Sequence, residues 1–144
     1  MRVENTGCAL ELKIHFKNRW MIVSPIESDG RSQVEIFMDD VSSNFQSNIS
    51  GLMVMMERHS KHGCETFNTE QCHYVDQSEK IYEYIKGRLR FFWFEDEDRV
   101  IVCTHGIVKK SQKTPKREID KALRVKTAYL LSKSSRSLQF IDEA

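Results

Sequence analysis

The sequence predicts an α+β fold in which an antiparallel sheet packs against helices on one of its faces. Three observations lead to this expectation. Short segments rich in aromatic and β-branched residues follow one another at 81–104, as in a β-meander. Stretches before and after them carry apolar residues at the spacing of amphipathic helices. The length of 144 residues fits one domain, since ~150 residues is the usual size.

The first half of the chain is expected to contain strands followed by two helices. A strand is predicted at 20–26 (WMIVSPI), and apolar and polar residues alternate in Leu10–Phe16, which indicates another. After the turn signal Asp29-Gly30, Ser32 and Glu35 form a capping-box pattern that starts a helix. Its apolar face holds Val34, Phe37, Met38 and Val41.

A second helix is expected to end at Gly63, and the polar residues 64–78 are expected to form a loop. The apolar positions of this helix are Phe45, Ile49, Leu52 and Met56.

The second half is expected to form a three-stranded antiparallel meander and a final helix. The strands are predicted at 81–85, 89–94 and 100–104. Thr114 is the expected helix cap, with Pro115 at the first helical position. The resulting organisation is an N-terminal extension (1–18), one domain (19–132) and a C-terminal tail (133–144).

Composition favours a cytoplasmic protein. The chain is 40% hydrophobic and 30% charged, and no apolar run approaches the ~20 residues that span a bilayer. An acid and polar residues occupy the start, where a signal peptide needs apolar ones, so neither export nor membrane association is expected. The four cysteines, Cys8, Cys64, Cys72 and Cys103, are therefore expected to be reduced thiols.

The net charge of +1 conceals a polarised chain. Residues 1–84 hold 8 Lys+Arg against 13 Asp+Glu, whereas residues 85–136 hold 14 against 6. A basic half is where a polyanion would dock, although a solvated charged helix is the simpler explanation of the charge alone.

The densest basic segment is Lys109–Arg117, with five cations and no acid in nine residues. It lies before the final helix, where unpaired backbone N–H groups and the helix dipole favour phosphate. Arg88 and Arg90 are two residues apart on the neighbouring strand and share a face, which Lys86 joins if the strand extends that far.

Tyr82 and Tyr84 share a face of the preceding strand. Cations beside aromatic rings suit single-stranded RNA, because bases stack on the rings and phosphates pair with the charges. Either tyrosine could equally belong to the core.

A basic site can cleave RNA without a metal when the 2′-hydroxyl of the RNA attacks the adjacent phosphate. The reaction needs a proton acceptor, a stabiliser of transition-state charge and a proton donor. Arginine suits the second role, because it is always charged and forks onto phosphate oxygens. The crowded Lys109, Lys110 and Lys113 are candidate acceptors, since neighbouring cations favour the neutral amine. His105 is an alternative acid or base, or simply a residue that closes a strand.

A zinc site was weighed against this chemistry. His59, His62, Cys64, Cys72 and His73 are of zinc-binding types, but their spacing matches no standard motif. Neither a metal nor another cofactor is therefore expected.

The second half of the chain resembles a known toxin family. The sequence His105-Gly106-Ile107-Val108-Lys109-Lys110, followed by Gln112-Lys113-Thr114-Pro115 and a basic helix, is similar to the HigB-like, phage-associated (Gp49-like) branch of the RelE/ParE toxin superfamily. Trp20–Gly63 is similar to the family's opening strand, turn and two helices. Residues 1–18 have no counterpart in the family and are either an added edge strand or an upstream reading ahead of Met21.

The resemblance implies a RelE-like fold, with an N-terminal strand and the meander packed against two N-terminal helices, and a basic C-terminal helix. It also implies a toxin of a type II toxin–antitoxin module: a ribosome-dependent endoribonuclease that cleaves mRNA in the ribosomal A site and inhibits translation. Such an mRNA interferase is neutralised by a cognate antitoxin, expected to be a helix-turn-helix protein.

The resemblance also implies roles for single residues. Arg90 matches a strand arginine that contacts the scissile phosphate, and Lys110 matches a second cation after the last strand. Thr114-Pro115 stands where RelE itself has a tyrosine, so Lys113 or Lys116 becomes the candidate general acid. The remaining expected RNA-binding residues are Lys86, Arg88, Tyr82, Tyr84 and Arg117.

A second hypothesis is a catalytically inactive nucleic-acid-binding or regulatory protein on the same fold, which would bind RNA or DNA without cleaving it. A third is a structural phage protein with an incidental basic face.

Overall fold

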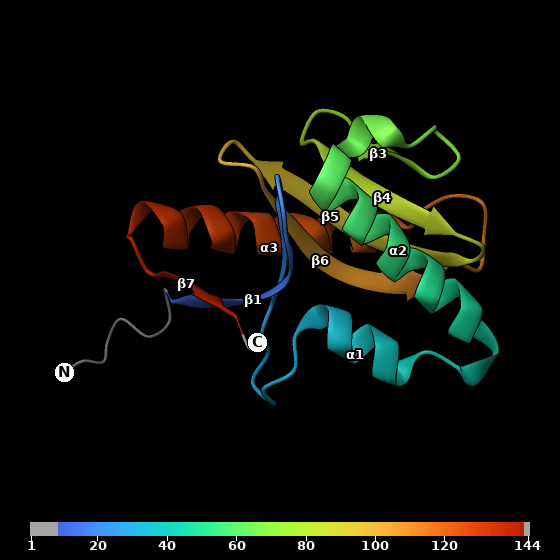
Figure 1. Cartoon of the computed structure of the whole chain (residues 1–144), viewed down its shortest axis with the longest axis horizontal. Coiled ribbons are helices and arrows are strands. Elements are labelled where there is room, and N and C mark those ends of the chain that lie inside the picture. Colours follow the sequence, from blue (N-terminus) through green and yellow to red (C-terminus); the bar gives the residue numbers. More distant parts are fainter. Residues whose placement is uncertain (1–8, 143–144) are drawn as a thin grey trace.

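The computed structural model describes residues 9–142, which form a mixed sheet of seven strands and three α-helices (Figure 1). No helix within this range combines the length and the apolar character needed to cross a bilayer. In chain order the elements are β1 (Leu10–Lys17), β2 (Met21–Pro25), α1 (Gln33–Asp40), α2 (Gln46–His62), β3 (Cys72–Asp76), β4 (Ile81–Lys86), β5 (Leu89–Asp96), β6 (Val100–Val108), α3 (Lys116–Ser134) and β7 (Leu138–Ile141).

The sheet is larger than the sequence predicts, and it is not purely antiparallel. Its strand order is β3-β4-β5-β6-β2-β1-β7. The predicted meander is confirmed as β4, β5 and β6, but β2 pairs with β6 in parallel, and β7 pairs with β1 in parallel. Strand β1, predicted as Leu10–Phe16, is confirmed, although β7 covers its outer side, so β1 is not an edge strand.

Two strands fall where the sequence predicts none. Strand β3 lies inside the expected loop 64–78, and β7 lies inside the expected tail 133–144. Both are edge strands with half-buried or exposed side chains, so they lack the apolar runs that reveal a buried strand.

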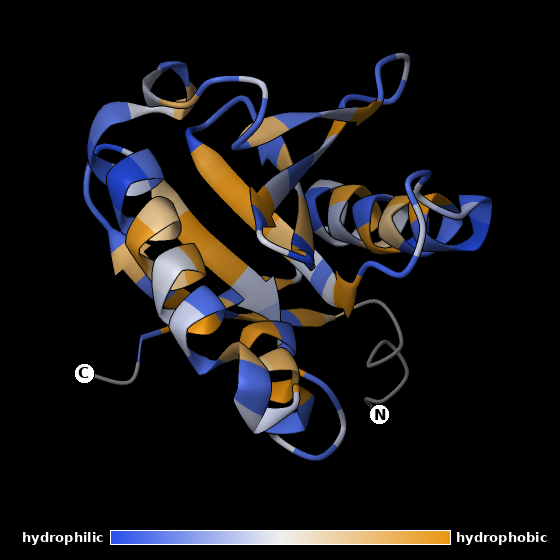
Figure 2. Cartoon of the chain, turned by 90° about the vertical axis from the view of Figure 1, so that its right-hand side faces the viewer, coloured by the Kyte–Doolittle hydropathy of each residue, from blue (hydrophilic) through white to orange (hydrophobic). Residues whose placement is uncertain are grey.

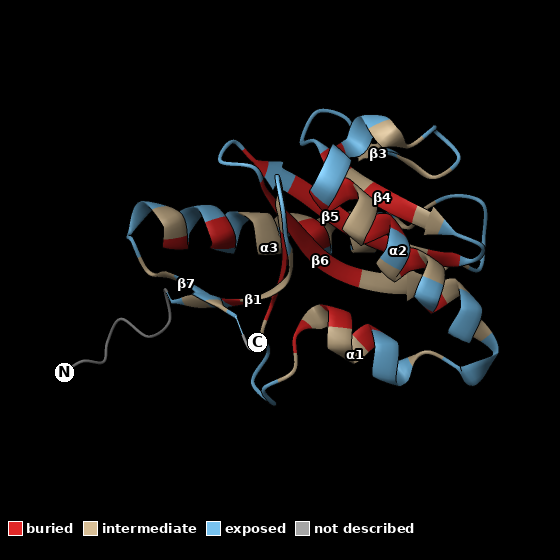
Figure 3. Cartoon of the chain, viewed as in Figure 1, coloured by how far each residue is buried: buried red, intermediate tan, exposed pale blue. Residues whose placement is uncertain are grey.

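Helices cover both faces of the sheet, so the prediction that they share one face was wrong. Figure 2 shows the apolar strands between α1 and α2 on one side and α3 on the other. The cause lies in β5, where Phe91 and Trp93 join the core under α1 and α2. Phe92 and Phe94 join the core under α3. The buried segments of Figure 3 follow these central strands, and a strand with apolar residues on both sides needs two covered faces.

The local signals at the helix ends are largely confirmed. The Ser32 hydroxyl accepts a hydrogen bond from the Glu35 N–H at 3.2 Å, and Glu35 Oε1 accepts one from the Ser32 N–H at 2.8 Å, which completes the capping box. Gly63 ends α2 with a φ of +83°, a backbone conformation that glycine adopts without strain. Helix α3 begins one residue later than predicted, because Pro115 has extended backbone angles and serves as the cap.

An ion pair between the buried Asp96 and the partly exposed Lys133 anchors α3 to the sheet. Asp96, at the end of β5, accepts hydrogen bonds from the Tyr129 hydroxyl and the Lys133 ammonium, both at 2.7 Å. The two donors are four residues apart, so they lie on the same face of α3.

Candidate functional site

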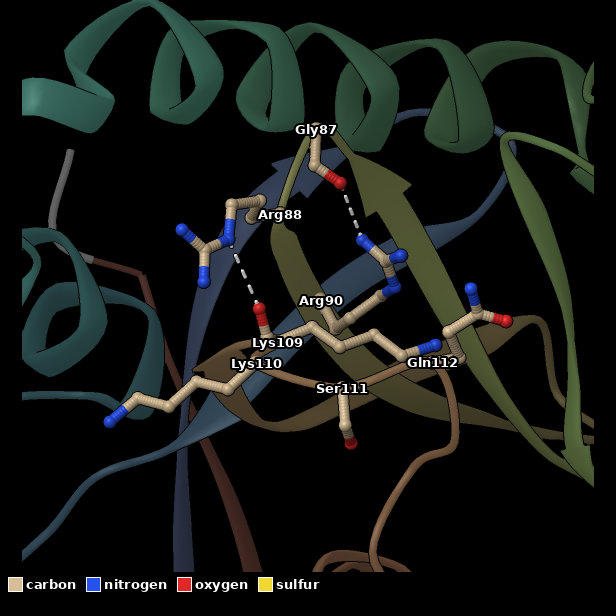
Figure 4. A pocket seen from close by; sticks show the side chains of 7 residues that line it. All are labelled: Gly87, Arg88, Arg90, Lys109, Lys110, Ser111 and Gln112. Carbon is tan, nitrogen blue, oxygen red and sulfur yellow. Dashed lines mark hydrogen bonds between the residues drawn. The ribbon is translucent and has the colours of Figure 1, made fainter.

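An open hollow of about 460 Å³ lies where the turn between β4 and β5 meets the end of β6 (Figure 4). It is lined by Gly87, Arg88, Arg90, Lys109, Lys110, Ser111 and Gln112. Four of these seven residues are cations and none is acidic. Such a concave, single-sign surface attracts anions, so the hollow is the natural docking point for a polyanion.

Hydrogen bonds at the end of the β5–β6 ladder hold the cationic residues together. The Lys109 N–H donates to the Arg88 carbonyl at 2.7 Å, and the Arg88 Nε donates to the Lys109 carbonyl at 3.2 Å. Arg90 is paired with Ile107 two residues further into the ladder. Segments about twenty residues apart in the chain are thus joined at one edge of the hollow.

Arg90 is held more tightly than its neighbours. Its side chain is only 13% exposed, and its Nη1 donates to the carbonyls of Gly87 at 2.7 Å and Leu89 at 3.0 Å. Its Nε lies 3.8 Å from Glu83 Oε2. A guanidinium fixed in this way loses little conformational entropy when it binds phosphate.

Both predicted lysines line the hollow with Arg90, but only the Lys109 side chain extends on the side of Arg90. Figure 4 shows the Lys109 side chain extending beneath Arg90 towards Gln112, whereas Lys110 extends in the opposite direction. The cause is an irregularity in β6: Phe92 pairs with His105 and Trp93 with Cys103, so Thr104 has no partner. A bulge of this kind exchanges the two faces for every later residue.

Lys113 and Lys116 do not line the hollow. Lys113 is exposed in the segment between β6 and α3. Lys116 is exposed and lies 3.7 Å from Asp120. Arg117 lines a second hollow of about 360 Å³ that shares Lys109, Lys110 and Ser111 with the first. The two hollows therefore adjoin along the segment before α3.

Lys86 and the two tyrosines lie on the other face of the sheet. Tyr84 is fully buried under α2, and Tyr82 is stacked on Trp93 with ring centres 4.2 Å apart. Lys86 shares their face and packs against Gly51 of α2. These three residues therefore do not lie with Arg90, because the even-numbered side chains of β4 face α2, where Tyr84 is buried and Lys86 is exposed at the strand end.

His105 is a structural residue. It is 2% exposed, and its Nε2 lies 3.0 Å from Glu118 Oε1 in the first turn of α3. Burial lowers the pKa of His105, against the opposing effect of Glu118. The ring is buried against Phe92 and Thr104 and does not line the basic hollow, so the structure does not bring His105 together with Arg90 and the lysines.

Glu83, which the sequence did not reveal as a site residue, lies beside Arg90 and holds His73, which was considered only as a zinc ligand. Glu83 of β4 is 1% exposed, and its Oε2 is 2.7 Å from Nε2 of His73 on β3. Its Oε1 accepts a hydrogen bond from the Thr114 hydroxyl at 3.5 Å, so Thr114 does not cap α3. The missing signal is the pairing of β3 with β4, which places His73 directly opposite Glu83.

The histidines and cysteines weighed as zinc ligands are dispersed. His59 is fully buried and lies 2.7 Å from the Tyr84 hydroxyl, within the core under α2. Across residues 9–142, no three His, Cys, Asp or Glu side chains are grouped as a metal would require.

A scan against protein-family models matches residues 37–127 to the family described as phage-derived protein Gp49-like (DUF891). The chain belongs to this family. The match spans α1 to most of α3 and includes every residue of the basic hollow. The Gp49-like family is toxin-like, and membership is consistent at this coarse level with a toxin of a toxin–antitoxin module. A search of curated proteins found no match.

Proposed function

We propose that this Gp49-like protein is a HigB-type toxin of a type II toxin–antitoxin module and that it cleaves mRNA in the ribosomal A site without a metal. The observation that carries the proposal is the hollow that gathers Arg88, Arg90, Lys109 and Lys110. Its antitoxin partner would be a helix-turn-helix protein that restores translation.

The proposed chemistry is attack of the RNA 2′-hydroxyl on the adjacent phosphate. Arg90 suits the stabilisation of charge on the phosphate, because its guanidinium is fixed by two backbone carbonyls before the ligand arrives. Lys109 adds a second positive charge from the same side of the sheet, as Figure 4 shows. The adjoining hollow at the start of α3 would receive a neighbouring phosphate, and Lys110 and Arg117 line it.

The test is inducible expression of the full chain, followed by growth measurement and mapping of mRNA ends at codon resolution. The unmutated protein is expected to arrest growth and cut mRNA on translating ribosomes. Arg90→Ala is expected to slow cleavage by about 10²–10³-fold, as for the loss of one transition-state donor. Lys61→Ala is the matched control, because Lys61 is an exposed cation on α2.

The proposal fails if the unmutated protein is harmless and leaves mRNA whole, or if Arg90→Ala cuts as fast as Lys61→Ala. Salt-dependent RNA binding without cleavage would instead support the inactive nucleic-acid-binding protein.

A further inference from the structure

The His73–Glu83 pair lies next to the basic hollow without lining it, and Glu83 connects the pair to Arg90. Glu83 is a carboxylate that is almost fully buried, yet its Oε2 faces both the His73 ring at 2.7 Å and the Arg90 guanidinium at 3.8 Å. His73 is 43% exposed on its side chain, so its ring reaches solvent while its Nε2 is held. The pair therefore joins a buried anchor to an accessible imidazole.

The charges around Glu83 explain how a buried carboxylate is tolerated there. Burial raises the pKa of Glu83, and this is the largest effect on it. Arg90 and Lys109 oppose the shift by their positive charge, His73 acts in the same direction, and the Thr114 hydroxyl opposes it by a hydrogen bond. These residues come from β3, β5 and the segment between β6 and α3. The carboxylate is thus the meeting point of the elements that build the site.

The orientation of His73 follows from this anchor. A carboxylate accepts a hydrogen bond, so Glu83 holds the proton of the neutral ring on Nε2 and leaves Nδ1 as the unprotonated nitrogen. An imidazole oriented by a carboxylate in this way is the arrangement that accepts a proton from a hydroxyl.

We propose that His73 is the general base of the reaction proposed above and that Glu83 is its positioning residue. The inference rests on the proposed function. It assigns the proton acceptor to β3, on the same face of the sheet as Arg90 and outside the segment 109–117.

Nδ1 of His73 takes the proton from the RNA 2′-hydroxyl as the 2′-oxygen forms its bond to phosphorus. The bond from phosphorus to the 5′-oxygen breaks, and that oxygen leaves with its electron pair and takes a proton from water. Arg90 and Lys109 stabilise the charge on the phosphate oxygens. The products are a 2′,3′-cyclic phosphate and a 5′-hydroxyl, and the imidazolium then returns its proton to solvent.

The experiment measures single-turnover cleavage of a defined mRNA on purified translating ribosomes, from pH 5.5 to 9, with the full chain. The variants are His73→Gln, whose amide can still donate to Glu83, and Glu83→Gln. His62→Gln is the matched control, because His62 is an exposed histidine at the end of α2. Binding to a fluorescent single-stranded RNA and thermal unfolding are measured on the same samples.

His73→Gln is expected to lower the cleavage rate by about 10²–10⁴-fold and to remove the acidic limb of the pH profile. RNA binding and thermal unfolding should stay close to those of the unmutated protein. Glu83→Gln is expected to lower the rate by about 10–100-fold, as for the loss of an orienting partner. The control should match the unmutated protein throughout.

The assignment is overturned if His73→Gln cleaves within threefold of the unmutated protein with the same pH profile, because a merely structural contact would survive this substitution. In that case Arg90-dependent cleavage remains and the proposed function stands. If the unmutated protein does not cleave at all, the proposed function falls, and the assignment falls with it.

Discussion

Gly106 is a position at which even one added methyl group should destabilise the folded protein. It lies in β6 opposite Phe91, and its missing side chain faces α1. A Cβ atom there would lie 2.7 Å from Cγ of Phe37 and 2.7 Å from Cδ2 of Phe91. These two rings pack edge to face with centres 5.4 Å apart, and both are buried, so neither can turn aside without opening the core.

Gly106→Ala therefore overpacks the core under α1. Overpacking by one methyl costs about 1–3 kcal/mol of unfolding free energy. Because a change of 1 kcal/mol moves the melting temperature by about 3–5 °C in a domain of this size, a fall of about 3–15 °C is expected.

Gly51→Ala is the matched control, and its expected effect has the opposite sign. Gly51 lies inside α2, where glycine costs about 0.5–1 kcal/mol relative to alanine. The three atoms nearest the new methyl would be carbons of the Lys86 side chain, which is exposed and can swing away. A rise of about 2–4 °C in melting temperature is expected.

Thermal and urea unfolding followed by circular dichroism measure both variants. The packing argument is refuted if Gly106→Ala melts at or above the temperature of the unmutated protein. It is also refuted if the two alanines destabilise the protein equally, because then the loss of glycine itself would be the cause.

Two further predictions concern stability. Burial lowers the pKa of His59 to about 4 in the folded protein, whereas its pKa in the unfolded chain is about 6.5. Between these two pH values, the unfolded chain therefore binds more protons than the folded protein. The free energy of unfolding should therefore fall by up to about 3 kcal/mol from this group as the pH drops from 6.5 to 4, and a flat urea-unfolding series would contradict it. Asp96→Asn removes the anchor of α3 and should lower the free energy of unfolding by about 2–4 kcal/mol. The Asp98 side chain is 70% exposed, so Asp98→Asn should lower the free energy of unfolding by less than about 0.5 kcal/mol in the same assay.

Local sequence signals predicted the meander, the capping box of α1 and the glycine end of α2, because each depends on residues close together in the chain. Helices were predicted on only one face of the sheet, although the sequence itself indicates that both faces are covered. Four consecutive apolar residues, Phe91–Phe94, indicate a strand buried on both sides. The apolar stripe of α3 supplies the second cover, through Ala122 and Tyr129.

The basic site was predicted in its location but not in its geometry. The alternation of β6, counted from Val100 and Val102 under α3, would place Lys110 on the face of Arg90. The unpaired Thr104 shifts that alternation by one residue, and Lys109 takes the place instead. A bulge depends on how two strands pair, so the spacing within one strand cannot reveal it.

The acidic residue in the site bears on the choice between a binding protein and an enzyme. If the hollow served only to hold phosphate, Glu83 would oppose that purpose, because its charge lies 3.8 Å from the best-placed guanidinium. Burying the carboxylate adds a further cost in stability. Cleavage needs a base and a charge stabiliser placed around the same phosphate. If the Glu83 carboxylate fixes the His73 ring and the Arg90 guanidinium in one geometry, that requirement explains why the protein tolerates both the weaker phosphate binding and the lower stability. On this argument, Glu83→Gln should strengthen RNA binding while it slows cleavage, which a site evolved for binding alone would not do.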